Sequence, residues 1–199
     1  SVWEMEYRFS EARETAASHK PPQFTLAQVL EGLQRLSMDI FGLKIDYSPC
    51  LFPWARGFQK ATVTDAQSGV ELGIIYLDLL ARRTKQAQSC HFTIRGSRTM
   101  KTTNLVYNLV DQPQAPISLI NSTIHNPAHV SWAETKTIMH EFGHALHNVC
   151  SASQFQANSG TRYSFEVAEV PGMFTERLLD IPDIARIYFA SHSTISNQA

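Results

Sequence analysis

Two histidines four residues apart, with a glutamate directly after the first, stand in the run TIMHEFGHALHNV at residues 137–149. If this run is helical, His140 and His144 point the same way one turn apart, so that one metal ion can bind both imidazoles. Glu141 is rotated by about 100° and lies beside the ion, where a base acting on metal-bound water is needed. The pattern therefore predicts a catalytic zinc site, in which two imidazoles and a carboxylate leave the fourth position to water.

The pattern alone is not decisive, because chance produces it in roughly 2% of chains of this length and composition. A third ligand is also needed, and one established spacing is excluded because it requires glycine and histidine where this chain has His147 and Cys150. The following segment FEVAEVPGMFTE offers the carboxylates of Glu166, Glu169 and Glu176. Glu166 and Glu169 share a helix face, so one can bind zinc while the other accepts a hydrogen bond from a ligand imidazole. Their spacing leaves both assignments open, and without the upstream histidines an acidic turn facing water would be equally expected.

Two further residues of the predicted zinc helix have more than one explanation. His147 is on the same side as His140 but lies about 10 Å along the axis, too far to complete the same coordination shell. We expect it to pack in the core or to support a ligand rather than to bind zinc. Gly143 costs roughly 1 kcal/mol of helix propensity relative to alanine, which favours close packing by a neighbour, another backbone or substrate.

Helix-capping residues mark the start of two helices. Thr25 and Gln28 form a capping box before a run of leucine and valine with helical spacing. Ser131 and Glu134 form a second box, which predicts a helix over residues 132–150 and places the zinc motif in its middle.

The rest of the chain divides into helical and strand-like segments. Residues 2–17 have a helical pattern, and Gly42 suits the left-handed end of the helix that begins after Thr25. After the zinc helix, another helix is expected to begin near Phe165, in which Pro171 is tolerated if it lies in the first turn, and one more is expected at IPDIARIYFASH. We expect an α+β fold, mainly α, in which residues 1–199 form one catalytic region with helices over 1–57, a small sheet over 58–125 and zinc-site helices over 131–199.

Composition excludes several classes of protein. The formal net charge of −1 provides no broad basic face for nucleic acid, and the run ARRTK at 81–85 is expected to be a solvated connection. Three cysteines without a C-x-x-C pair do not suit a secreted disulfide framework. No apolar run reaches the roughly 18 residues that a membrane span needs. The first residues, SVWEMEYRFSEARE, do not suit a targeting peptide, and we interpret the chain as an internal segment of a longer precursor.

Several segments together resemble the thimet oligopeptidase family of zinc peptidases, family M3. HEFGHALH resembles the zinc helix of that family, and GTRYSFEVAEVPGMFTE resembles the segment with its third ligand, which this resemblance places at Glu169. ELGIIYLDLLAR and CHFTIRGSR are similar to the strands before the zinc helix, the second particularly in the mitochondrial intermediate peptidase branch. Two positions depart from the family pattern, which usually has serine at Gly172 and aspartate at Glu166.

The resemblance implies a zincin-like, mostly helical enzyme with a deep channel and a small sheet whose edge pairs with extended peptide. It implies one zinc ion on His140, His144 and Glu169, with Glu141 as the base and Glu166 and His147 as supporting residues. The substrates implied are mitochondrial precursor proteins, from which a short N-terminal peptide is removed in the matrix. The alternatives are a general oligopeptidase, which could be cytoplasmic, and a catalytically inactive zinc-binding fragment.

The resemblance also implies that this chain is the middle of a larger molecule. The long N-terminal helical region of the family and its C-terminal residues that stabilise the transition state have no counterpart here. We therefore expect weak or no activity from these 199 residues alone, and apolar surface that favours self-association.

Overall fold

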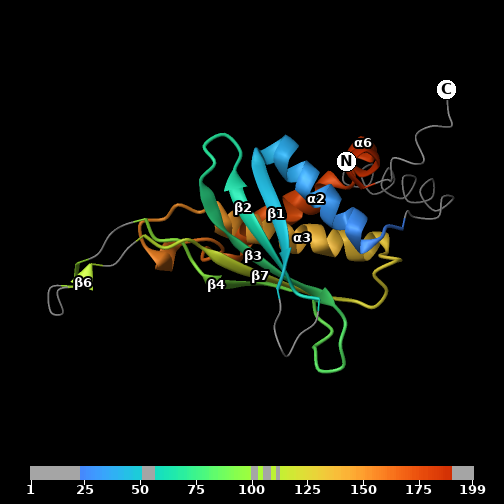
Figure 1. The fold of residues 1–199 in the computed structure, drawn as a ribbon, viewed down its shortest axis with the longest axis horizontal. Helices are drawn as coiled ribbons and strands as arrows, with labels where there is room; N and C mark the ends of the chain where they lie inside the picture. The colour runs from blue at the N-terminus through green and yellow to red at the C-terminus, as the bar shows by residue number, and fades with distance from the viewer. Residues whose placement is uncertain (1–22, 51–56, 100–102, 105–108, 111–112, 190–199) are drawn as a thin grey trace, which may run out of the picture.

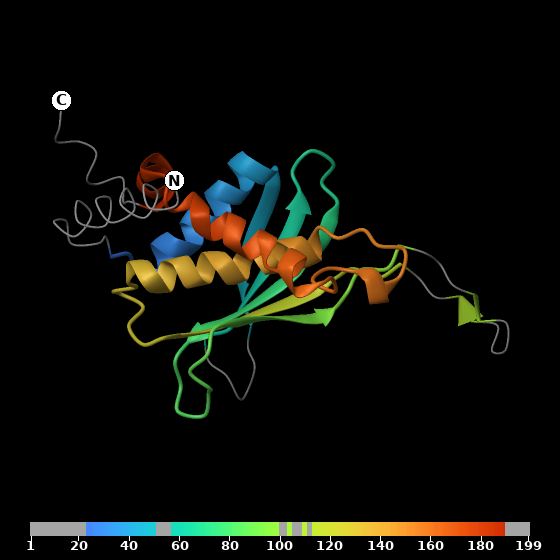
Figure 2. The same cartoon turned by 180° about the vertical axis from the view of Figure 1, so that it is seen from behind.

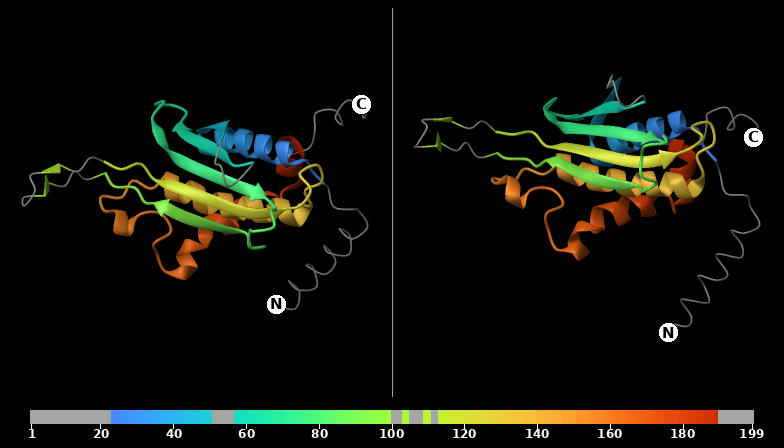
Figure 3. Two further views of the ribbon diagram at one scale, coloured as in Figure 1. Left: turned by 60° about the horizontal axis from the view of Figure 1, so that its bottom comes forward. Right: turned by 90° about the horizontal axis from the view of Figure 1, so that it is seen from below.

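The computed structural model describes residues 23–50, 57–99, 103–104, 109–110 and 113–189. A five-stranded sheet lies on one side of the molecule, and helices cover one of its faces (Figures 1 and 3). The strands are β1 (Leu43–Pro49), β2 (Gln59–Asp65), β3 (Glu71–Leu80), β4 (Cys90–Arg95) and β7 (Ile117–Ile124). Two short strands, β5 (Thr103–Asn104) and β6 (Leu109–Val110), pair separately. The predicted helix at 2–17 falls outside the described residues.

The strand order of the sheet is β1-β2-β3-β7-β4. Neighbouring strands are antiparallel except β3 and β7, which are parallel. Two parallel neighbouring strands need a long connection between them. Strand β4 and the small β5–β6 pair belong to the connection from β3 to β7, and β4 pairs with β7 at the edge of the sheet.

The helices differ in length. The two long ones are α2 (Leu26–Phe41), before the strands, and α3 (Trp132–Val149), after them. After a 3₁₀ turn at Gln156–Asn158, the chain forms α4 (Phe165–Ala168), α5 (Val170–Leu178), α6 (Pro182–Ile184) and a π-helical turn at Ala185–Phe189. Helix α5 lies beside α3, as the view from behind shows (Figure 2). The helix expected from near Phe165 is divided into α4 and α5, and Pro171 lies in the first turn of α5.

Both predicted capping boxes are present. The Thr25 hydroxyl accepts from the backbone N–H of Gln28 at 3.2 Å, and the Gln28 side chain accepts from the Thr25 N–H at 2.7 Å. The Ser131 hydroxyl accepts from the Glu134 N–H at 3.2 Å, and the Glu134 carboxylate accepts from the Ser131 N–H at 2.8 Å. Gly42 ends α2 with a φ of 65°, the left-handed conformation that glycine adopts without steric cost. Local sequence therefore sets where both long helices start and where α2 ends.

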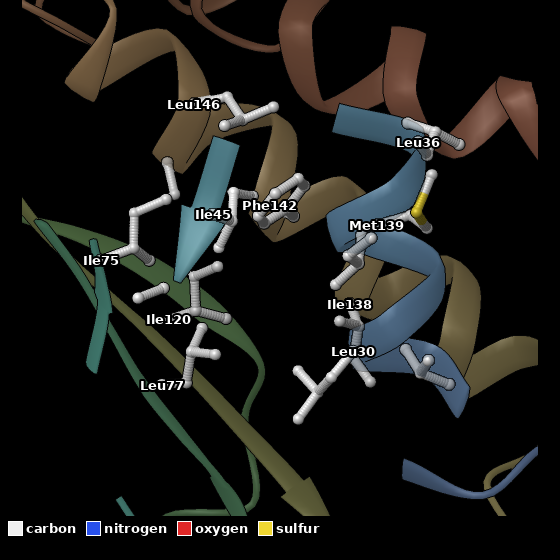
Figure 4. Packing of buried hydrophobic residues seen from close by; sticks show 14 of the residues in the cluster. Leu30, Leu36, Ile45, Ile75, Leu77, Ile120, Ile138, Met139, Phe142 and Leu146 are labelled. Atoms are coloured by element: carbon white, nitrogen blue, oxygen red, sulfur yellow. The ribbon is translucent and has the colours of Figure 1, made fainter. Parts of the chain in front are cut away.

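The hydrophobic core lies between the sheet and helices α2 and α3 (Figure 4). Alternate residues of β7 are buried, as expected for a strand with one face against helices. The labelled core side chains come from α2 (Leu30, Leu36), α3 (Ile138, Met139, Phe142, Leu146), β1 (Ile45), β3 (Ile75, Leu77) and β7 (Ile120). Helix α3, which carries His140 and His144, is thus held against the sheet through its apolar residues.

The structure differs from the sequence prediction in three respects. The fold is mixed α/β, and a predominance of helix is not confirmed in the described residues. Strand β1 lies within the region 1–57 that was expected to be helical, because its alternating pattern at Leu43–Pro49 pairs with β2. The connection at 81–85 was expected to be solvated, but the Lys85 side chain is only 4% exposed and lies 3.0 Å from Asp78.

Within the described residues, no helix has both the length and the apolar character needed to cross a membrane.

Candidate metal centre

Three side chains converge where α3 meets the start of α5. The Nε2 atoms of His140 and His144 are 3.1 Å apart. One carboxylate oxygen of Glu169 lies 3.2 Å from Nε2 of His140 and 3.5 Å from Nε2 of His144. These three residues are the metal-ligand group found among the described residues.

The dimensions of this group fit a zinc ion. A tetrahedral zinc with ligand distances of 2.0–2.1 Å separates neighbouring ligand atoms by about 3.3–3.4 Å. The three observed separations of 3.1, 3.2 and 3.5 Å bracket that value. Burial and the neighbouring His140 lower the pKa of His144, which favours the neutral imidazole that metals bind.

A second glutamate, Glu176, contacts the ring nitrogen of His140 that faces away from the candidate metal position. Oε2 of Glu176 lies 3.3 Å from Nδ1 of His140, so this ring can donate to Glu176 while its Nε2 faces the metal position. The sequence interpretation gave this supporting role to Glu166. The structure does not bring Glu166 there: its side chain is exposed, and among the described residues it has no hydrogen bond to either imidazole.

Glu141 lies beside the group rather than in it, as the helical spacing predicted. It lines an open cavity of 430 Å³ together with the three candidate ligands. Burial raises the pKa of its carboxyl, while His140 and a hydrogen bond from the backbone N–H of His91 oppose this shift. A partly desolvated carboxylate with an elevated pKa is suited to take and return a proton near neutral pH.

His91, on the edge strand β4, is a site residue that the sequence interpretation did not identify. Its ring stacks on His144 with centroids 6.0 Å apart, and its Nε2 lies 3.0 Å from the Ser118 hydroxyl. Burial, with smaller contributions from His144 and His147, lowers the pKa of His91 to about 4, so the ring is neutral. No motif marks this residue, because its position depends on the pairing of β4 with β7.

His147 does not join the candidate ligands. Its ring stacks on Tyr163 with centroids 5.8 Å apart, and its Nδ1 is buried without a hydrogen bond among the described residues. It lines a separate, mostly apolar cavity of 350 Å³ with Phe174 and Cys150. All three cysteines are free thiols, and Cys90 lines the cavity beside the candidate metal group.

Known proteins are similar to this chain over most of its length. The model of peptidase family M3 matches residues 1–198. The chain belongs to peptidase family M3. Similar M3 proteins include the mitochondrial intermediate peptidases of Schizosaccharomyces pombe, 27% identical over 219 residues, and of Homo sapiens, 29% identical over 179 residues. That of Pleurotus djamor is 29% identical over 210 residues.

These M3 relatives are much longer than the chain. The matches cover 94%, 89% and 88% of this chain but 28%, 23% and 27% of the S. pombe, human and P. djamor proteins. The chain therefore spans about a quarter of the length of the relatives it matches. Their names support a mitochondrial location for it.

Proposed function

We propose that this M3 chain carries the zinc site of a metalloendopeptidase, with His140, His144 and Glu169 as the ligands. The observation that supports this most is the ligand triangle, whose edges match a tetrahedral zinc. Zinc bound there would polarise the scissile carbonyl and lower the pKa of a water molecule it binds.

Residues around the ligands would transfer the proton and orient a ligand. Glu141 takes a proton from the attacking water and delivers it to the leaving amine, which its partly buried position in the cavity allows. Glu176 fixes the orientation of His140.

The sheet beside the site suits an extended peptide. Strand β4 is the last strand in the sheet order, and its residues Cys90 and His91 line the cavity of the candidate ligands. A peptide can add to such an edge as a further strand, with main-chain hydrogen bonds that do not depend on its sequence. By relation to the mitochondrial intermediate peptidases, we propose that the substrates are imported precursor proteins that lose a short N-terminal peptide.

The decisive experiment is Glu141→Gln in the complete polypeptide that contains these residues. We expect zinc content to be unchanged and cleavage of a precursor with its N-terminal peptide to fall by 100-fold or more, since general base catalysis contributes roughly that factor. Glu71→Gln, an exposed glutamate on β3, is the matched control and should cleave normally. Equal cleavage by the Glu141→Gln protein would refute the mechanism. Cleavage of short peptides alone by the unaltered protein would instead identify a general oligopeptidase.

A further inference from the structure

The helices α3 and α5 meet unusually closely directly beside the candidate zinc ligands. A Cβ atom on Gly143 of α3 would lie only 2.3 Å from both the carbonyl oxygen of Pro171 and the hydroxyl oxygen of Thr175 on α5. The Thr175 hydroxyl donates to the carbonyl oxygen of Met139 on α3 at 2.7 Å. Thr175 is only 3% exposed, so this hydrogen bond between the helices is shielded from water.

The residues of this crossing are direct chain neighbours of the site residues. Three of the four contact residues directly precede a candidate ligand or the glutamate that contacts His140, in the pairs Met139–His140, Gly143–His144 and Thr175–Glu176. The ligand triangle itself spans the same two helices, because the histidines belong to α3 and Glu169 immediately precedes α5. Two of its three edges, the 3.2 and 3.5 Å distances to Glu169, therefore change whenever α5 moves relative to α3.

We infer that Thr175 is a positioning residue that sets the zinc affinity of this site through the separation of α3 and α5. The inference rests on the proposed function in one respect, namely that the triangle binds zinc. The hydroxyl also lies 3.1 and 3.0 Å from the carbonyl oxygens of Pro171 and Gly172 in its own helix. It has a single proton to donate, and the shortest of the three distances is the one to Met139 across the helix interface.

Valine at this position tests the role without a large change of shape. A methyl group in place of the hydroxyl would start 2.7–3.1 Å from three carbonyl oxygens. Carbon and oxygen atoms in contact require about 3.3 Å or more, and only the 2.7 Å contact with the Met139 oxygen crosses to α3, so relief of that contact increases the separation of the two helices. Thr175→Ala removes the same hydrogen bond without this steric effect, and Thr175→Ser keeps the hydroxyl.

Thr135 provides a matched control. It is fully buried on α3, and its hydroxyl donates to the carbonyl oxygen of Ser131 at 2.9 Å within the same helical segment. Thr135→Val therefore loses a buried threonine hydroxyl of the same kind, but no bond between α3 and α5. It should lower the melting temperature without changing zinc affinity.

The experiment measures the zinc dissociation constant by competition with a chelator, and the visible spectrum of the Co²⁺-substituted protein, below the melting temperature of every variant. We expect Thr175→Val to weaken zinc binding roughly 10-fold and to alter the Co²⁺ spectrum, as changes around metal ligands do. Thr175→Ala should weaken binding several-fold, and Thr175→Ser should stay within about twofold of the unaltered protein.

Two results would overturn the inference. One is that Thr175→Ala leaves the zinc affinity and the Co²⁺ spectrum unchanged, and that Thr175→Val does the same where it folds. The other is a Thr135→Val protein that loses as much zinc affinity as the Thr175 variants, since this would indicate general destabilisation. Failure of the proposed function gives a different result, because the unaltered protein would then bind no zinc and both proposals would fall together.

Discussion

The three glutamates after the zinc helix should differ sharply in their effect on zinc affinity when each is changed to glutamine. Glutamine keeps the length and volume of the side chain, so the series isolates the carboxylate charge. Glu169 contributes an oxygen to the ligand triangle, Glu176 contacts the rear nitrogen of His140, and Glu166 is exposed. The expected order of the effect is therefore Glu169, then Glu176, then Glu166.

The magnitudes follow from these contacts. Glu169→Gln removes the anionic ligand and should weaken zinc binding by more than 100-fold, which is more than about 2.7 kcal/mol at roughly 1.36 kcal/mol per factor of ten. Glu176→Gln can still accept from Nδ1 of His140 at 3.3 Å, but the hydrogen bond loses its charge and about 1.4 kcal/mol, so binding should weaken roughly 10-fold. Glu166→Gln should change zinc affinity by less than about twofold, because water already surrounds its carboxylate.

The assay is competition between the zinc-free protein and a chelator of known affinity at one pH and salt concentration. Circular dichroism and melting temperature provide the control for folding of each variant. The reasoning is wrong if Glu166→Gln weakens zinc binding more than Glu176→Gln. A Glu169→Gln protein that holds zinc within 10-fold of the unaltered protein would show that the third ligand has been misassigned.

Three further predictions concern the residues around the site and the core. His147→Ala should leave one zinc ion per chain, because its ring stacks on Tyr163 away from the ligands; elemental analysis showing loss of zinc from a folded variant would contradict this. Asp78→Ala should lower the free energy of unfolding by about 3–5 kcal/mol in urea titration, because the buried Lys85 ammonium keeps its backbone acceptors but loses its anionic partner. The exposed Asp46→Ala control should lose less than about 1 kcal/mol. Equal losses in the two variants would show that Lys85 does not depend on this pair. With zinc bound, these 199 residues should cleave a quenched peptide at least 100-fold more slowly than a full-length mitochondrial intermediate peptidase, since a single missing oxyanion donor costs roughly that factor; comparable rates would mean that the chain contains the whole catalytic apparatus.

The sequence by itself determined the features that depend on neighbouring residues. The spacing of His140 and His144 fixes their common direction wherever the helix forms, because helical geometry repeats every 3.6 residues. The two capping boxes and the left-handed glycine of α2 have the same local origin, and the structure contains all three. The sheet was likewise predictable from alternating runs, although its first strand was not, because its alternating pattern follows directly after a helix.

The third ligand was assigned by family resemblance, since local spacing did not choose between Glu166 and Glu169. Tertiary structure separates the positions of the carboxylates, because packing of α5 on α3 brings Glu169 and Glu176 to His140 and leaves Glu166 exposed. A signal for Glu176 existed in its spacing of seven from Glu169, which places both on one face of a helix.

The position of His91 and the packing of α5 on α3 depend entirely on tertiary structure. His91 reaches His144 only because β4 returns to pair with β7 at the edge of the sheet. Of the possible reasons for Gly143, packing against another backbone is the one observed, since α5 occupies the space that a side chain would need. Helical geometry fixes the separation of residues within one helix, but the distance between two helices depends on every side chain packed between them. That distance sets two of the three edges of the candidate ligand triangle, and no local pattern in the sequence encodes it.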